Sequence, residues 1–308
     1  MPVRTALLVI LIAASACIRQ PVAGELPSEA PVSPTTAAVT ATSTTTVPAA
    51  EPILVAADQR YLSTFAYDVW IPADPNLSGA IPLVVLLHGG GPAGRRALEP
   101  LAIELARHDI AVMNAGYAPP GRGGQFPGPF LAATCATALA LSQAESLGAD
   151  PDRVFVVGYS FGAVAAAVAV HSGELFTSPD CPAVAERPLA GWVGISGPYD
   201  LDLLAAAASD AMVSFFGGDR EARTASWTAA DPYSYPTPSG LPAVLIHGTA
   251  DPEVPVSVTD EYRAWLTDAG DTVQLVVIDE GTHLSVIDPT SATAAVDAIV
   301  AFVQRPIE

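Results

Sequence analysis

The most informative stretch of the chain is RVFVVGYSFG, residues 153–162. An apolar run typical of a buried strand leads into a Gly-x-Ser-x-Gly motif, and an Ala/Val-rich helical pattern follows. A strand, a sharp turn and a helix hold the serine, Ser160, exposed at the turn, where it can act as a nucleophile. The glycines permit a strained backbone, and the helix N-terminus offers positive potential to an oxyanion. The alternative is an ordinary strand-to-helix turn.

Short apolar runs alternate with helical patterns on both sides of this stretch. The runs expected as strands are 67–71, 83–87, 110–113, 154–157, 192–195, 243–246 and 273–278. The segments expected as helices are 96–107, 130–147, 161–170, 256–269 and 291–303. Several strand runs are continuously apolar, which is typical of strands buried on both faces. We therefore expect an α/β fold over residues 51–308, with a mostly parallel sheet flanked by helices on both faces.

A serine nucleophile needs a base, and the base needs a carboxylate that orients it. Asp251 follows the expected strand 243–246, and His283 follows the last one. Because reactive groups gather beyond the carboxyl ends of parallel strands, we expect Ser160, His283 and Asp251 to meet there. Asp279 and Glu280 remain alternatives for the acid, since they directly precede the histidine loop.

The sequence His88-Gly89-Gly90-Gly91 follows the expected strand 83–87. Its glycines permit a loop whose backbone N–H groups face a bound oxygen. The N–H groups of Gly89 and Gly90, together with that of Phe161, are the candidates for an oxyanion hole. Taken alone, a glycine-rich turn after a strand is most often only a turn.

These four motifs follow one another in the chain as His88-Gly89-Gly90-Gly91, the Ser160 turn, Asp251 and His283. In this chain order they resemble the motifs of the α/β-hydrolase-fold carboxylesterases. His88-Gly89-Gly90-Gly91 is similar to the motif of hormone-sensitive-lipase-like esterases. The sequence Asp251-Pro252-Glu253-Val254-Pro255 is closer to that of dienelactone-hydrolase-like and prolyl-oligopeptidase-like enzymes. The resemblance implies that Ser160, His283 and Asp251 hydrolyse a small-molecule or lipid ester through an acyl-serine intermediate, without a cofactor.

Two other functions remain open, namely a serine peptidase of the prolyl-oligopeptidase-like type and a non-catalytic surface-binding lipoprotein. The long segment 197–242 between two expected strands bears on substrate shape. It either forms an apolar lid or pocket wall, or packs a helix pair onto the sheet. Its aromatic residues include Phe215, Phe216, Trp227, Tyr233 and Tyr235.

The charge of the chain excludes several other classes of function. With 13 basic and 32 acidic residues the net charge is −19, so we expect no nucleic-acid partner. Every basic residue is an arginine, which excludes a P-loop lysine and a Schiff-base lysine. No His-x-x-x-His or Cys-x-x-Cys pair occurs, so we expect no metal site. The remaining histidines are interpreted as structural: His88, His108, His171 and His247.

The first 16 residues are typical of an export signal peptide, with Arg4 before an apolar run at residues 6–16. That run is too short to cross a hydrocarbon core of about 30 Å. Ala14-Ser15-Ala16-Cys17 fits a signal-peptidase site and also resembles a bacterial lipobox. We expect an exported protein whose only membrane contact is a lipid on Cys17, or otherwise a secreted one.

Residues 17–50 are expected to form a linker between this anchor and the folded domain. Of the 33 residues 18–50, 22 are Pro, Thr, Ser or Ala, a composition that cannot bury enough surface to fold. If Cys17 carries lipid, Cys135 and Cys181 remain as a pair in an oxidising compartment. Either a disulfide joins them or both stay free, because the sequence does not give the distance between them.

Overall fold

A computed structural model of the chain describes residues 51–62, 64–74, 77, 81–185 and 187–306. The predicted signal peptide, the linker and Cys17 lie outside the described residues. The strands are β1 (Ile53–Tyr61), β2 (Phe65–Ile71), β3 (Ile81–Leu87), β4 (Ala111–Ala115), β5 (Ala149–Tyr159), β6 (Gly191–Ile195), β7 (Ala243–Gly248) and β8 (Val273–Ile278). The α-helices are α1 (Glu99–Arg107), α2 (Gly128–Gln143), α3 (Phe161–His171), α4 (Leu201–Ala207), α5 (Ser209–Phe216), α6 (Thr224–Ala230), α7 (Val256–Ala269) and α8 (Thr293–Val303).

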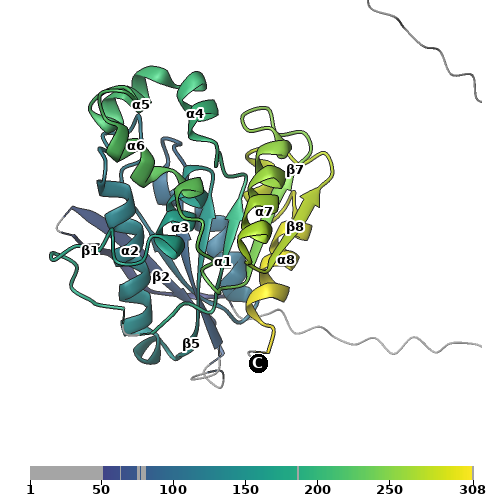
Figure 1. Cartoon of the computed structure of the whole chain (residues 1–308). Helices are drawn as coiled ribbons and strands as arrows, with labels where there is room; N and C mark the ends of the chain where they lie inside the picture. Colours follow the sequence, from purple (N-terminus) through teal and green to yellow (C-terminus); the bar gives the residue numbers. More distant parts are fainter. Residues whose placement is uncertain (1–50, 63, 75–76, 78–80, 186, 307–308) are drawn as a thin grey trace, which may run out of the picture. The chain divides into compact units, whose positions relative to one another are not determined.

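The strands form one eight-stranded sheet in the order β1-β2-β4-β3-β5-β6-β7-β8. Figure 1 shows β1 and β2 toward one side of the molecule and β7 and β8 toward the other. The six strands from β4 to β8 in this order pair in parallel, whereas β2 is antiparallel to both β1 and β4. The predicted α/β fold with a mostly parallel sheet is therefore confirmed. After β4 the chain crosses back over β3 to form β5, and such a reversal opens a crevice beyond the carboxyl ends of the strands.

Helices cover both faces of the sheet, as the continuous apolar runs predict. In β3, Leu83, Val85 and Leu87 pack into the core beneath α2 and α3. The alternate residues Val84 and Leu86 pack into a second core with α1 and α8. Because successive side chains of a strand point to opposite faces, a strand between two helix layers must be apolar at every position.

The structure differs from the sequence prediction mainly at the edges of the fold. Strand β1 was not predicted, because its side chains are almost all exposed at the edge of the sheet and no apolar alternation marks it. Helix α1 starts three residues later than expected, because residues 94–98 form a 3-10 turn. Helix α7 has the predicted bounds.

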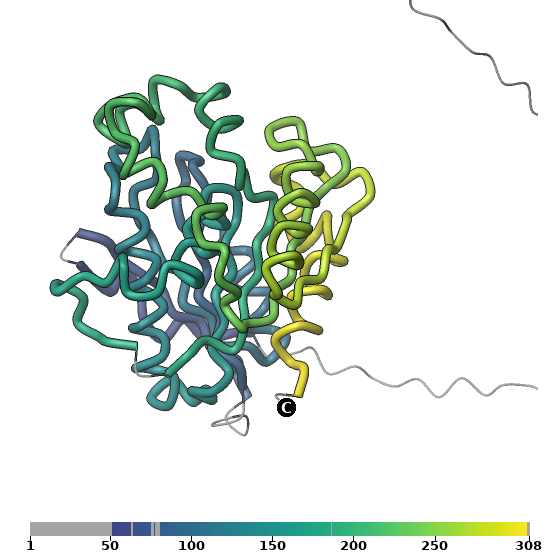
Figure 2. Tube along the Cα trace, viewed as in Figure 1, coloured from purple at the N-terminus to yellow at the C-terminus, as the bar shows by residue number. Residues whose placement is uncertain are grey.

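The long segment 197–242 contains three short helices, α4, α5 and α6, which were not predicted from the sequence. Each has only seven or eight residues, too few for a clear helical period. Asp200 caps α4 by accepting hydrogen bonds from the backbone N–H groups of Asp202 and Leu203. Figure 2 shows α4 and α5, in green, at the upper edge of the molecule as drawn, from where the chain descends through α6 toward β7.

A disulfide joins Cys135 of α2 to Cys181 in the loop that follows α3, with 5.6 Å between the Cα atoms. Of the two alternatives left open by the sequence, the structure has the bridged one. The bond ties the loop that follows α3 to helix α2.

Candidate active site

Ser160 lies at the tip of the sharp turn between β5 and α3. Its backbone has φ 54° and ψ −125°, in the left-handed region that non-glycine residues seldom adopt. The two glycines of the motif make this turn possible. A Cβ on Gly158 would lie 2.1 Å from the carbonyl oxygen of Gly162, and a Cβ on Gly162 would lie 2.1 Å from that of Leu87.

The structure brings Ser160, His283 and Asp251 together in one hydrogen-bonded chain. His283 Nε2 lies 3.0 Å from Ser160 Oγ, and His283 Nδ1 lies 2.7 Å from Asp251 Oδ2. A carboxylate accepts, so Nδ1 carries the proton and Nε2 is free to accept the serine proton. The side chains of His283 and Asp251 are both buried. The alternative acids Asp279 and Glu280 are exposed, and neither takes the place of Asp251 on Nδ1.

Asp251 is held by four donors. Its Oδ1 accepts the backbone N–H groups of Glu253 at 2.8 Å and Val254 at 2.9 Å. Its Oδ2 lies 2.7 Å from His283 Nδ1 and 3.2 Å from His247 Nε2. Burial alone would raise the pKa of Asp251, but the hydrogen bonds from His247, His283 and the backbone outweigh it and hold that pKa far below its usual value. The carboxylate is therefore ionised wherever the protein is folded near neutral pH.

Hydrogen bonds to three consecutive carbonyl groups orient the glycine loop after β3. Tyr117 OH donates to the His88 carbonyl, His88 Nδ1 lies 2.7 Å from the Gly89 carbonyl, and Arg122 Nε donates to the Gly90 carbonyl at 3.2 Å. In a trans peptide the next N–H points opposite to the carbonyl. The N–H groups of Gly89 and Gly90 are thus turned away from these partners. Burial lowers the pKa of His88, which suits a neutral bracing residue.

The loop also comes close to Ser160. A Cβ on Gly89 would lie 2.7 Å from Ser160 Cβ, so only glycine fits there. Phe161 is the first residue of α3, and the N–H groups of a first helical turn have no partner within the helix. The three residues predicted for the oxyanion hole, Gly89, Gly90 and Phe161, therefore all border the cavity beside the serine.

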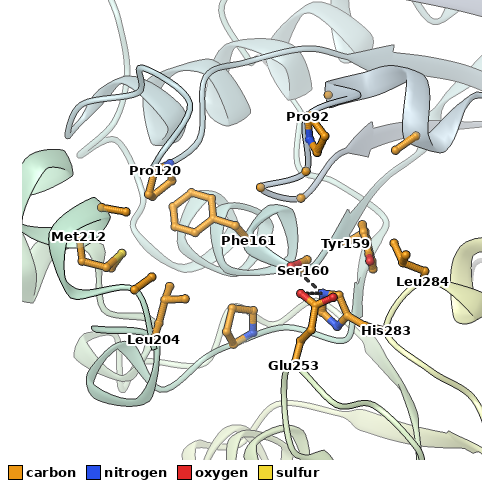
Figure 3. Close-up of a pocket in the computed structure, with 18 residues that line it drawn as sticks. Pro92, Pro120, Tyr159, Ser160, Phe161, Leu204, Met212, Glu253, His283 and Leu284 are labelled. Carbon is orange, nitrogen blue, oxygen red and sulfur yellow. Dashed lines mark hydrogen bonds and ion pairs between the residues drawn. The ribbon is translucent and has the colours of Figure 1, made fainter. Parts of the chain in front are cut away.

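A cavity of about 460 Å³ opens above Ser160. Figure 3 shows Leu204, Met212, Phe161 and Pro120 on one side of the serine, Tyr159, His283 and Leu284 on the other, and Glu253 below the serine, beside His283. The first side is apolar, and the residues that α4, α5 and the residue between them contribute to it are Leu204, Ala208, Ala211 and Met212. The aromatic residues Phe215, Phe216 and Trp227 of the same segment are buried in the core. The segment 197–242 thus forms a pocket wall and, through other residues such as Phe215, also packs against α2 and α3.

Residues 67–266 of the chain match the family described as BD-FAE. The chain belongs to the BD-FAE family. Its members are α/β-hydrolase esterases, so the predicted enzyme class, a carboxylic ester hydrolase, is confirmed. The match covers the strands from β2 to β7 and includes Ser160 and Asp251, whereas His283 lies beyond its end.

A curated relative of this BD-FAE protein is a probable isoprenylcysteine alpha-carbonyl methylesterase from Oryza sativa subsp. japonica. The two are 29% identical over 237 residues, which is 70% of this chain and 53% of the relative. The chain therefore spans about half the length of the curated relative that it matches.

Solved structures with the same fold include esterases. Thermogutta terrifontis esterase 2, phosphonylated by sarin, has a TM-score of 0.65 and 17% identity, over 83% of this chain and 94% of that one. An acetyl ester-xyloside bifunctional hydrolase from Caldicellulosiruptor lactoaceticus has a TM-score of 0.61 and 17% identity, over 77% and 86% of the two chains. These likenesses show the shared α/β-hydrolase fold.

Two residues of the BD-FAE site were missed as functional candidates in the sequence. His247 was interpreted as structural, but besides its contacts to Thr259 and Val254 its Nε2 reaches the carboxylate of Asp251. Glu253 was quoted only as part of a motif, yet it lines the cavity. The sequence signal that could have identified His247 is its position at the end of β7, four residues before Asp251. A tight loop between the two residues brings Asp251 back toward the end of the strand.

Within the described residues, no group of three or more His, Cys, Asp or Glu side chains is arranged to hold a metal ion. None of the helices described here is long and apolar enough to cross a membrane.

Proposed function

We propose that this protein is an exported serine esterase that cleaves carboxylic esters through an acyl-serine intermediate. The observation that carries the proposal is the continuous hydrogen-bonded chain from Ser160 Oγ through His283 to Asp251, at the floor of a cavity. The distances, 3.0 and 2.7 Å, are those of a nucleophile in reach of its base and a base held by its carboxylate.

In the proposed reaction, Ser160 Oγ attacks the ester carbonyl carbon while His283 Nε2 takes the serine proton. Asp251 keeps the proton of Nδ1 in place and stabilises the imidazolium. The carbonyl oxygen becomes an oxyanion that the N–H groups of Phe161, Gly89 and Gly90 stabilise. When the tetrahedral intermediate collapses, His283 returns the proton to the departing alcohol oxygen. A water then attacks the acyl-serine by the same steps, releasing the acid and restoring Ser160.

The position of His283 suggests which half of the cavity takes which half of the ester. The departing oxygen must lie within hydrogen-bond reach of Nε2, so the alcohol occupies the side that carries His283. The acyl group then lies on the opposite, apolar side, against Leu204, Met212 and Phe161. A wall of this kind favours a small uncharged acyl group.

The relatives support carboxylic esters as the substrate class. The rice relative is named a methylesterase, the Caldicellulosiruptor lactoaceticus protein an acetyl ester-xyloside hydrolase, and Thermogutta terrifontis esterase 2 has been solved with propionate and with butyrate. We propose short-chain esters of this kind, in a small-molecule or a lipid substrate.

The test compares the full chain with its Ser160→Ala variant on 4-nitrophenyl esters of two to eight carbons. We expect the variant to lose about 10⁴-fold or more in kcat, since the nucleophile is removed. Mass spectrometry of the rapidly quenched wild type should detect an acyl group on the peptide with Ser160. Equal rates in the two proteins would contradict the proposal and leave the peptidase and binding-protein alternatives for peptide-cleavage and binding assays.

Export and lipid attachment are a separate part of the proposal, supported by the signal-like residues 1–16 and by Cys17. Expression of the full chain in a bacterium fed radiolabelled palmitate should label the wild type and leave Cys17→Ser unlabelled. Label on both proteins, or on neither, would contradict an anchor at Cys17. Release of the wild type into the medium without label would indicate plain secretion.

A further inference from the structure

Glu253 carries the only acidic side chain among the described residues that line the cavity, and no arginine lines it. One of its carboxylate oxygens, Oε2, lies 3.8 Å from His283 Nε2, the nitrogen that also faces Ser160 Oγ. Its backbone N–H donates to Asp251 Oδ1 at 2.8 Å. The backbone of Glu253 is therefore fixed by the same carboxylate that orients the histidine, while its side chain, 62% exposed, extends into the cavity opening.

The alcohol half of the substrate lies beside this carboxylate. His283 Nε2 must reach the departing oxygen, and Glu253 flanks that nitrogen. The groups attached to the departing oxygen therefore pass within a few ångströms of a negative charge. The acyl half faces the apolar wall on the other side of Ser160, away from Glu253 (Figure 3).

We propose that Glu253 selects the ester by the charge of its alcohol, favouring a cationic alcohol over a neutral one of the same shape and disfavouring an anionic one. This inference rests on the proposed esterase function. Since the carboxylate is more than half exposed, solvent screens it, and we expect about a fivefold preference for the cation at low salt. At 1 M salt the screening length falls to about 3 Å, so the preference should largely disappear.

The experiment measures kcat/KM of the full chain on three acetate esters of similar size. They are acetylcholine, its uncharged isostere 3,3-dimethylbutyl acetate, and the anionic 3-acetoxypropanesulfonate. In Glu253→Gln the ratio of cationic to neutral ester should fall about fivefold toward one. Glu253→Arg should reverse the order and favour the anionic ester.

The matched control is Glu280→Gln, which makes the same change of charge at an exposed residue outside the cavity lining. This control is needed because the net charge of −19 attracts cations to the whole molecule. We expect Glu280→Gln to keep the wild-type ratio. An equal change of the ratio in both variants would assign the selectivity to the overall charge and overturn the proposal.

Two further results would overturn it. An unchanged ratio in Glu253→Gln would mean that the alcohol does not meet this side chain. An equal loss on all three esters would mean that Glu253 acts on His283 and not on the substrate. If the wild type hydrolyses the neutral ester and Ser160→Ala does not, either result leaves the proposed function intact. A wild type inactive on every ester would end both proposals.

Discussion

Of the buried His–Asp pairs in the described part of the chain, His283–Asp251 faces a nucleophile, whereas His171–Asp271 does not. His283 Nδ1 lies 2.7 Å from Asp251 Oδ2, and His171 Nε2 lies 3.1 Å from Asp271 Oδ2. The side chains of the second pair are each 1% exposed, and those of the first are 5% and 1% exposed. Distance and burial therefore do not tell the two pairs apart.

The difference lies at the second nitrogen of each histidine. His283 Nε2 faces the hydroxyl of Ser160, which can give up a proton. His171 Nδ1 lies 2.8 Å from the carbonyl oxygen of Ala167, within its own helix, and a carbonyl has no proton to give. A His–Asp pair can thus act as a base only if its free nitrogen meets a donor beside a cavity. The second pair joins α3 to the residues after α7 and is structural.

The largest expected effect is a difference in kcat between variants of the two aspartates, Asp251 and Asp271. Asp251→Asn should lower kcat by about 10⁴-fold, because an amide no longer holds the proton on His283 Nδ1. Asp271→Asn should keep kcat per folded molecule within about twofold, since its histidine touches no substrate. Circular dichroism gives the folded fraction of both variants, since a serine-reactive titrant would need the base that Asp251→Asn impairs. Similar losses in the two variants would mean that the two pairs do not differ in function.

The next effect concerns the glycine loop after β3, which lies beside the His283–Asp251 pair and not beside the His171–Asp271 pair. Gly89→Ala should lower kcat by about 10²-fold, because the new Cβ, 2.7 Å from Ser160 Cβ, must displace the loop or the serine. Gly91→Ala is the matched control, since no heavy atom lies within 4 Å of a Cβ there. Steady-state kinetics on one short ester measures both. Loss of activity in the control alone would contradict the placement of the oxyanion-binding N–H groups.

The structural pair should show its role in stability. Asp271 also accepts hydrogen bonds from Ser239 Oγ and the N–H of Gly240, so Asp271→Asn leaves buried donors without their charged acceptor. We expect the free energy of unfolding to fall by about 1–3 kcal/mol. Urea denaturation followed by fluorescence measures it. A stability equal to that of the wild type would show that the pair contributes nothing to the fold.

A smaller effect is expected at a carboxylate whose partner is a permanent cation and not a histidine. Arg95 Nε donates to Asp68 Oδ2 at 2.8 Å. Burial would raise the pKa of Asp68, but the hydrogen bonds from Arg95 and from the N–H of Asp58 outweigh it and lower that pKa. The stabilisation is therefore present above the unfolded value, about 4, and is lost as the pH falls through the lowered folded value.

Asp68→Asn should thus lower the free energy of unfolding by about 1 kcal/mol at pH 7, which is roughly the contribution of the lost ion pair. Below pH 4 the difference between the two proteins should shrink, because Asp68 of the wild type becomes protonated. Urea midpoints of both proteins at pH 7 and pH 3 make the comparison. A difference that grows on acidification would have the wrong sign for this account.

Much of the site could be predicted because it lies where strands end. Ser160, Asp251 and His283 each follow an apolar run, and a parallel sheet brings such positions to one edge. His247 and Glu253 were missed because their roles depend on how one loop folds back on Asp251, which no periodicity records. Strand β1 was missed because its side chains are almost all exposed at the edge of the sheet and show no apolar alternation.

By itself the sequence determined the fold class, the order of the chemical groups and the need for glycine around Ser160, because these depend on local patterns and on strand-end positions. Only the tertiary structure decided that the His283–Asp251 pair meets the hydroxyl of Ser160, which side chains of α4 and α5 wall the cavity, and that the carboxylate of Glu253 borders the cavity beside His283. Those outcomes depend on contacts between segments that lie far apart in the chain, and no local sequence pattern encodes such contacts.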